Sequence, residues 1–214
     1  MSTNVTDWVV DKLATPGGLV IVERTPENFL VVRSRNDYMF VVAVLGVQDV
    51  IGLSAVEPLF NGTTKPQLVV NIPSKSLWSG AAIDRIHAES AAFGAFGDIS
   101  RAAGTGRAGF YREKNMEFFI NAMKQHSNVS NVSYVYETVS KADRKIGASL
   151  IVAVIEAYNM SAEDVRNAKA RFGHFDVVVK SSSYGSITDQ AQAAAKSIGA
   201  QALTFRQLMG RLAN

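Results

Sequence analysis

The sequence predicts an α/β protein built from two tandem copies of one unit. Three observations predict this fold: the chain matches itself at a nearly constant offset, its apolar runs lack polar alternation, and helix-like stretches separate those runs. The 214 residues are 47% hydrophobic and 19% charged and include no cysteine. This composition is typical of a globular protein and excludes disulfides, thiolate metal sites and cysteine nucleophiles.

The self-comparison indicates an internal repeat. Residues 41–44 (VVAV) match residues 151–154 (IVAV) at an offset of 110, and residues 68–70 match residues 177–179 at an offset one shorter. Further matches follow in the same order: residues 8–10 with 118–120, residues 92–95 with 197–200, and Arg101 with Arg206. Because the element order persists at nearly constant spacing, we predict a duplication, with copies over residues 1–103 and 110–214.

The first copy begins with a short helix over residues 7–13, for which Thr6 or Asp7 is the cap and residues 16–18 (PGG) are the stop. Runs rich in β-formers follow, and turn residues such as Pro26, Asn28 and Asp37 separate them. The remaining elements are strands over residues 19–24, 29–33 and 39–47, a helical stretch to about Phe60, a strand over residues 67–72, and a long helix over residues 81–93.

The second copy repeats this arrangement. Ser161 and Asp164 have the spacing of a capping box and begin a helix that ends near Phe172, and Gly199 ends a later helix. The expected elements are a helix over about residues 114–125, β runs over 132–139 and 149–157, the capped helix, a strand over 176–180, a helix over 188–198, a strand over 201–205 and a last helix over 206–212.

Three of the strand runs, over residues 41–45, 68–70 and 177–179, are continuously apolar. Such runs are buried on both faces, so we expect central sheets flanked by helices. Residues 104–109 (GTGRAG) have no apolar period and are interpreted as a linker between the copies. They have glycines that could wrap a phosphate, but the Lys-Ser/Thr of a phosphate-binding loop is absent, so the linker interpretation is favoured.

Helix, three strands, helix, strand, helix is the element order of the restriction-endonuclease-like fold. Residues 175–209 resemble the end of Mrr-type endonuclease domains: the apolar strand FDVVV leads to an Ala-rich helix that begins with Thr188, a short strand follows Gly199, and a last helix closes the domain. The resemblance covers these residues at the level of motifs and the rest by element order. It implies two αβββαβ units, each with a central mixed sheet flanked by helices.

Nucleases of this fold use an Asp and an acid-x-Lys pair on adjacent strands, where the carboxylates hold Mg²⁺ and the Lys helps to position water. Residues 39–47 contain no acid, so the resemblance implies that the first copy is catalytically degenerate. In the second copy Asp143 and Glu156 lie thirteen residues apart, a hairpin spacing, and are the candidate catalytic and metal-binding pair. Tyr158 occupies the place of the family's Lys, and Lys169 or Lys180 is the substitute.

The acidic pair also has an ordinary explanation, as strand-end and turn residues, and we favour this explanation. The three histidines, His87, His126 and His174, lack metal-ligand spacing, which argues against a zinc site.

The net charge of +3 and the pI of about 9.2 allow binding to nucleic acid. Serine clusters at residues 74–76 and 181–185 follow corresponding strands, where parallel sheets bind ligands, and basic residues surround Phe110 and Tyr111. The candidate contacts are Lys75, Arg101, Arg107, Arg112, Lys114, Lys180 and Ser182. Ordinary turns and a solvated domain junction would explain the same residues.

We therefore expect a non-catalytic, nucleic-acid-associated protein of degenerate nuclease-like fold, of phage or mobile-element origin. One alternative is a nuclease that uses Mg²⁺ in the second copy, and another is a structural or assembly subunit with no nucleic-acid role. Nucleic acid and a second copy of the chain are the partners considered. Residues 1–7 do not resemble a signal peptide and the longest apolar run is too short to span a bilayer, so a cytoplasmic location without a membrane partner is expected.

Overall fold

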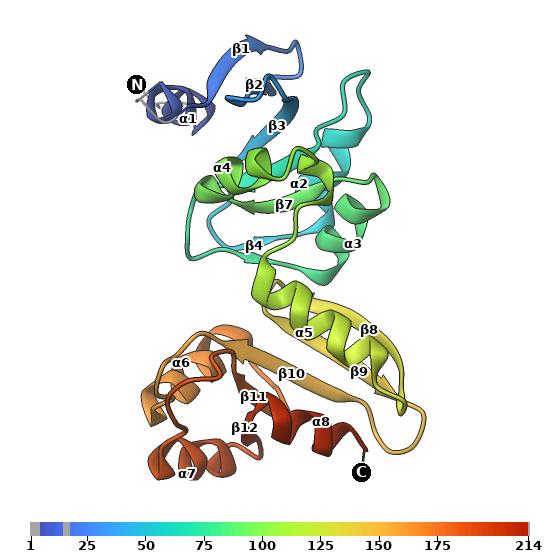
Figure 1. The fold of residues 1–214 in the computed structure, drawn as a ribbon, viewed down its shortest axis with the longest axis vertical. Helices are drawn as coiled ribbons and strands as arrows, with labels where there is room; N and C mark the ends of the chain where they lie inside the picture. Colours follow the sequence, from blue (N-terminus) through green and yellow to red (C-terminus); the bar gives the residue numbers. More distant parts are fainter. Residues whose placement is uncertain (1–4, 15–17, 214) are drawn as a thin grey trace. The chain divides into compact units, whose positions relative to one another are not determined.

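The computed structural model describes residues 5–14 and 18–213. The chain divides into two compact units, Met1–Glu113 and Lys114–Asn214, and each has helices packed around one five-stranded mixed sheet (Figure 1). The α/β class and the mixed sheets expected from the sequence are confirmed. Within the described ranges, no helix is both long and apolar enough to span a membrane.

The first unit contains a sheet with the strand order β1-β2-β3-β5-β7. Its elements are α1 (Val5–Leu13), β1 (Val20–Arg24), β2 (Leu30–Arg33), β3 (Met39–Leu45), β4 (Val50–Ile51), α2 (Leu53–Val56), the 3₁₀ helix η1 (Glu57–Phe60), β5 (Leu68–Asn71), β6 (Leu77–Trp78), α3 (Gly80–Ala88), β7 (Ala92–Ala95), α4 (Phe96–Gly104) and the 3₁₀ helix η2 (Ala108–Phe110). β1, β2 and β3 are antiparallel, whereas β3, β5 and β7 are parallel.

Both faces of the first sheet are covered around β3 and β5. Val42 and Leu68 belong to a core cluster that includes Val9 of α1 and Ile99 of α4. Successive residues of a strand point to opposite faces, and the next residue in β3, Ala43, is buried as well. This arrangement explains why the strand runs are apolar without alternation.

The second unit contains a sheet with the strand order β8-β9-β10-β11-β12. Its elements are α5 (Lys114–Gln125), β8 (Val129–Tyr136), β9 (Val139–Arg144), β10 (Leu150–Ile155), α6 (Ala162–Phe172), β11 (Val177–Lys180), α7 (Asp189–Ser197), β12 (Gln201–Thr204) and α8 (Phe205–Ala213). The first three strands are again antiparallel, and β10, β11 and β12 are parallel.

Two clusters cover the two faces of the second sheet. Val152 of β10 packs in one cluster with residues of α5 and α8, including Phe119 and Leu208. Its neighbour Ala153 belongs to the other cluster, which includes Val165 of α6 and residues of α7. The capping box expected at Ser161 is confirmed and begins α6.

The helix expected over residues 81–93 is confirmed as far as Ala88 and is wrong for residues 89–93. α3 ends at Ala88, and Ser90 has a φ of 56°, which interrupts the helical backbone. The amide of Ala92 then donates to the carbonyl of Gln67, so that residues 92–95 continue as β7 beside β5. The proposed match of residues 92–95 with 197–200 therefore joins a strand to the end of a helix, because α7 ends at Ser197.

The β run expected over residues 132–139 is two strands. β8 ends at Tyr136 and β9 begins at Val139, with Glu137 and Thr138 in the turn between them. β9 contains polar residues such as Lys141 and Asp143, so it does not form an apolar run in the sequence.

The glycine-rich stretch 104–109, expected as a linker, lies within the first unit. Gly104 ends α4, and the fully buried Ala108 donates its amide to the Tyr38 hydroxyl at 2.8 Å. The division between the units falls after Glu113.

A buried carboxylate attaches this segment to the first unit. Asp98 is 9% exposed and accepts from the Tyr111 hydroxyl at 2.6 Å and from the Arg101 guanidinium at 2.9 Å. Its other oxygen accepts from the Ala95 amide at 2.8 Å, which closes the first turn of α4. Burial, together with the hydrogen bond to Asp98, raises the pKa of the Tyr111 hydroxyl.

Removing the Tyr111 hydroxyl tests this attachment. We expect Tyr111→Phe to lower the free energy of unfolding by about 1–3 kcal/mol, because the buried Asp98 carboxylate loses a donor that water cannot replace. Urea unfolding followed by circular dichroism measures the change. The control is Tyr184→Phe, at an exposed tyrosine, which should change it by less than about 0.5 kcal/mol. Equal stability of the two variants would contradict the assignment.

Candidate functional site

Two loops lie side by side in the second unit, after the parallel strands β10 and β11. The pairing of Ile155 with Lys180 brings the strand ends together. A parallel bridge then joins Met160 to Ile187, and the Met160 amide donates to the Ser186 carbonyl at 2.9 Å. Residues 156–161 and 181–188 therefore form one edge of the unit, the edge at which parallel sheets bind ligands.

Lys180, a candidate phosphate contact, has a different role here. It is the last residue of β11 and is only 2% exposed. Its ammonium group donates to the carbonyls of Ser182 and Tyr184. A buried charge requires such partners. The hydrogen bonds of Lys180 therefore hold the second loop in place, and its ammonium group is not exposed to a ligand.

Side-chain and backbone contacts hold the two loops together. The Asn159 side-chain oxygen accepts from the Ser186 amide at 2.9 Å and from its hydroxyl at 3.2 Å. Gly185 has a φ of 73°, and a Cβ atom there would lie 1.9 Å from the Tyr158 carbonyl oxygen. This position requires glycine, because the two backbones approach too closely for a side chain.

In the first unit, the loops that follow β3 and β5 are held together by Asn71, the buried last residue of β5. The Asn71 amide donates to the carbonyls of Val47 at 3.0 Å and Pro73 at 3.2 Å, and its oxygen accepts from the Val47 amide at 2.9 Å. Short strands β4 and β6 pair the two loops. A buried polar side chain at a strand end thus organises the loops in both units.

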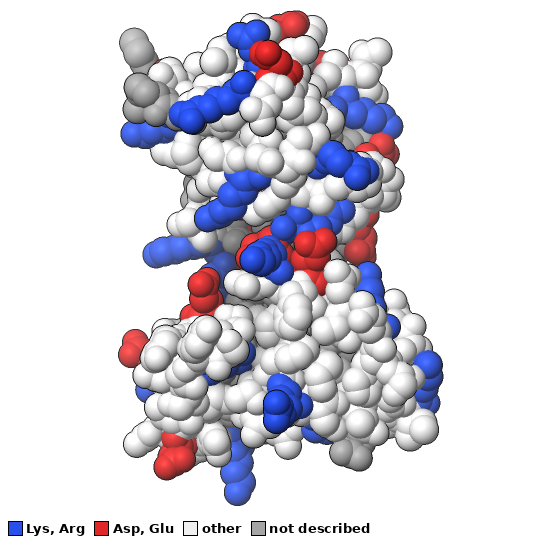
Figure 2. Space-filling model, viewed as in Figure 1, with Lys and Arg blue, Asp and Glu red and all other residues white. Residues whose placement is uncertain are grey.

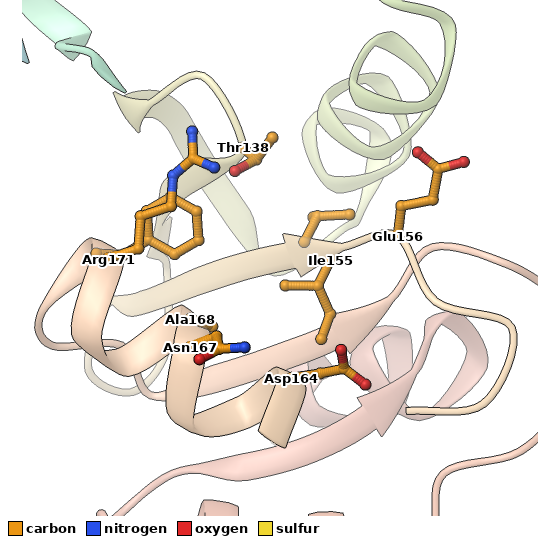
Figure 3. Close-up of a pocket in the computed structure, with 9 residues that line it drawn as sticks. Thr138, Ile155, Glu156, Asp164, Asn167, Ala168 and Arg171 are labelled. Atoms are coloured by element: carbon orange, nitrogen blue, oxygen red, sulfur yellow. The ribbon is translucent and has the colours of Figure 1, made fainter. Parts of the chain in front are cut away.

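An open pocket of about 280 Å³ lies next to the first of the two loops in the second unit (Figure 3). It lies between the end of β10, the turn before β9 and helix α6. The lining residues are Thr138, Val154, Ile155, Glu156, Asp164, Asn167, Ala168, Arg171 and Phe172.

Most charged groups around this pocket are engaged. Arg171 donates to Glu137 at 3.0 Å, and its guanidinium lies 5.3 Å from the centre of the Phe172 ring. Asp164 accepts from the Ser161 amide and hydroxyl, both at 2.8 Å. The Glu156 carboxylate is exposed and points away from Asp164 in Figure 3.

Asp143 and Glu156 are not brought together. Ala142 of β9 pairs with Leu150, so Asp143, the next residue of β9, lies beside the start of β10. Glu156 follows the opposite end of β10. Six residues of extended chain separate the two places, roughly 20 Å. The pair therefore does not fit a shared Mg²⁺ ion, and no cluster of three potential His, Cys, Asp or Glu ligands occurs among the residues that the structure describes.

The strand register places a different acid near Glu156. The Val154 amide donates to the Thr138 carbonyl at 2.8 Å, so the turn residue before it, Glu137, lies close to the end of β10. The sequence analysis missed both Glu137 and its partner Arg171. The polar pair 137–138 inside an apolar run was the available signal for the turn.

Asp143 belongs to a polar cluster on β8, β9 and the residue before β10. Its carboxylate accepts from Ser149 at 2.7 Å and Asn131 at 3.3 Å, and it pairs with Lys141 at 2.8 Å. These donors lower the pKa of Asp143 from 3.8 to about 2, and the bond from Lys141 has the largest effect. Asp143 is therefore a residue of β9 next to the end of the strand, and not the turn residue that the ordinary explanation expected.

The remaining candidate cations are distributed over both units. Arg101 pairs with Asp98, and Arg112 donates to the carbonyls of Ala91, Gly109 and Tyr111. These contacts give Arg101 and Arg112 structural roles within the first unit.

Lys75 and Arg107 are exposed in the first unit, and the Arg107 guanidinium lies 4.6 Å from the centre of the Phe110 ring. Lys114 begins α5, and Lys169 is half-buried in α6 without lining the pocket. Ser182 follows β11 and accepts from the Tyr184 amide at 3.1 Å. These candidates are therefore divided between the two units, with Lys75 and Arg107 in the first and Lys114, Lys169 and Ser182 in the second.

The excess of positive charge belongs to the second unit. Residues 1–113 contain 10 Lys and Arg against 11 Asp and Glu, whereas residues 114–214 contain 12 against 8. Figure 2 shows basic side chains spread over the visible face, with acidic ones among them. The net positive charge of the chain is therefore a property of the composition of the second unit.

Comparison with known proteins gave no match: no protein-family model, no curated protein and no solved structure is similar to the chain.

The contacts of Asp143 predict a dependence of stability on acidity. Because its pKa is lower in the folded state, its stabilising contribution is present above pH 3.8 and is lost as the pH falls to about 2. We expect Asp143→Asn to be less stable than the wild type near neutral pH and to lose less stability on acidification. Urea midpoints across this range measure both effects. The exposed Glu156→Gln serves as the control, and a wild-type pH dependence in Asp143→Asn would contradict the assignment.

Proposed function

We propose that the protein binds nucleic acid without cleaving it, on a duplicated nuclease-like fold that has lost its metal centre. The support for duplication is the common order of helices and strands and the common strand pairing of the two sheets. β5 and β11, β7 and β12, and α4 and α8 begin at positions 109 residues apart in each case.

Individual side chains follow the same spacing. Asn71 and Lys180 end equivalent strands and hold loop carbonyls. Ser79 and Thr188 each cap the next helix, and each hydroxyl donates at 3.0 Å to a backbone carbonyl, that of Ile51 in the first unit and that of Met160 in the second. Shared contacts of this detail favour a common origin over independent arrival at one element order.

The endonuclease-like part of the proposal rests on the element order and on the position of the pocket. The ends of two adjacent strands meet there, which is where nucleases of this fold place their acids. In the first unit Gly46 occupies the place of Glu156, since Val42 and Val152 are equivalent in the two sheets. In the second unit Glu137 is paired with Arg171.

One observation carries the proposal of binding without cleavage: Arg171, which pairs with Glu137, lines the same pocket as Glu156 in the unit with the excess of basic residues. A guanidinium group at this position attracts a phosphate and repels a divalent cation. Arg171 is the basic residue in the lining of this pocket, which also contains the acids Glu156 and Asp164, and we infer that its guanidinium group is the contact for a phosphate.

Labelled single- and double-stranded DNA and RNA test the proposal by fluorescence anisotropy, in the presence of Mn²⁺. We expect binding that weakens between about 50 and 200 mM salt, and no cleavage products. Arg171→Ala should weaken binding and reduce the slope of log affinity against log salt by about one. Arg166→Ala removes the same charge from the same helix outside the pocket and should have a smaller effect.

Two results would contradict the proposal. Absence of binding to all four nucleic acids would favour an assembly subunit. Cleavage that is lost in Glu156→Ala would favour a metal-dependent nuclease in the second unit.

A further inference from the structure

The paired loops of the second unit, residues 156–161 and 181–188, each contain one exposed tyrosine. Tyr158 is 68% exposed and Tyr184 is 75% exposed, although aromatic rings usually bury most of their surface. Single exposed apolar residues are common, but these two belong to loops that touch. The Tyr158 carbonyl lies against Gly185, the residue that follows Tyr184.

The backbone that carries these rings is fixed before any ligand binds. Lys180 holds the Tyr184 carbonyl from below, and the Ser182 hydroxyl accepts from the Tyr184 amide at 3.1 Å. On the other loop, Asn159 follows Tyr158 directly and is bound to Ser186. A ligand that contacts the rings therefore does not have to order the loops, which favours affinity.

The polar groups around the rings suit a base more than a duplex backbone. Hydroxyl and amide groups of Ser183 and Asn159 are exposed on the same loops, and the nearby carboxylate is that of Glu156. The two loops contain no lysine or arginine that would track two phosphate strands, and Lys180, which precedes the second loop, is buried. Stacking on aromatic faces with hydrogen bonds to base edges is how proteins hold unpaired bases.

From these contacts we propose that Tyr158 and Tyr184 form a stacking platform for unpaired bases of a single-stranded nucleic acid. The inference rests on the proposed nucleic-acid function and adds the residues and the strandedness. The platform belongs to the second unit, because Lys75 occupies the place of Tyr184 in the first unit, 109 residues earlier. The basic excess of the second unit supplies the attraction for the phosphates, and the rings supply the contact with the bases.

The test measures binding of the full chain to a labelled oligo-dT strand and to a duplex of the same length. We expect tighter binding of the single strand. Tyr158→Ala and Tyr184→Ala should each weaken it by roughly tenfold, with an unchanged salt slope, because no phosphate contact is removed. Tyr158→Phe and Tyr184→Phe keep the rings and should bind nearly as the wild type does.

Ile146→Ala is the matched control, because Ile146 is 77% exposed in the same unit but lies on the β9–β10 hairpin. It should leave binding unchanged. Thermal melting checks that all variants fold, and the exposed positions of both tyrosines make this the expected result.

The outcomes separate the two proposals. Wild-type protein that binds no nucleic acid overturns the proposed function. Binding that Tyr158→Ala and Tyr184→Ala leave intact, a preference for the duplex, or equal losses in the Phe and Ala variants would overturn the stacking platform while nucleic-acid binding stands. Tyrosine-dependent binding of an oligosaccharide in place of oligo-dT would also overturn it.

Discussion

The buried ammonium group of Lys180 is the constraint on which the edge of the second unit depends. A cation removed from water is tolerated when hydrogen-bond acceptors replace its hydration, and here two loop carbonyls do so. The loop after β11 cannot move away without leaving this charge uncompensated. The position of Tyr184 follows from that requirement. The loop with Tyr158 is held in turn by the bonds from Ser186 to Asn159, and its carbonyl approaches so closely that position 185 requires glycine.

The same principle operates in the first unit with a neutral group. Asn71 satisfies both an amide and carbonyls of the flanking loops, so a buried side chain of different charge performs an equivalent structural task. The two units differ in the exposed side chains of these loops, where Tyr184 of the second unit corresponds to Lys75 of the first. Under the proposed duplication, each copy keeps one loop pair held by a buried side chain, and the two copies differ in surface chemistry while the strand pairing of the sheets is the same.

Much of the fold was predictable because local patterns decided it. The apolar run 177–179 identified β11, Ser161 and Asp164 identified the start of α6, and residues 181–183 were expected at a ligand-binding edge. β7 was missed because Ala92–Ala95 has little β preference and forms a strand through its pairing with β5. Such tertiary pairing leaves no periodic signal.

The site was less predictable because it depends on register and burial. The thirteen residues between Asp143 and Glu156 suit a hairpin, but the actual pairing places them at opposite ends of β10. Arg171 and Glu137 are 34 residues apart in sequence, and Lys180 belongs to a residue type that is rarely buried. In the sequence, Tyr158 was singled out only as a departure from the nuclease motif.

The most direct measurement is photocrosslinking of the full chain to an oligonucleotide that carries 5-bromodeoxyuridine, with the adducts located by mass spectrometry. We expect adducts within residues 156–161 and 181–188, with Tyr158 and Tyr184 as the modified side chains. An excess of unlabelled single strand should reduce the yield of these adducts more than an excess of duplex does. Adducts confined to the first unit, or adducts in the second unit that spare both loops, would contradict it.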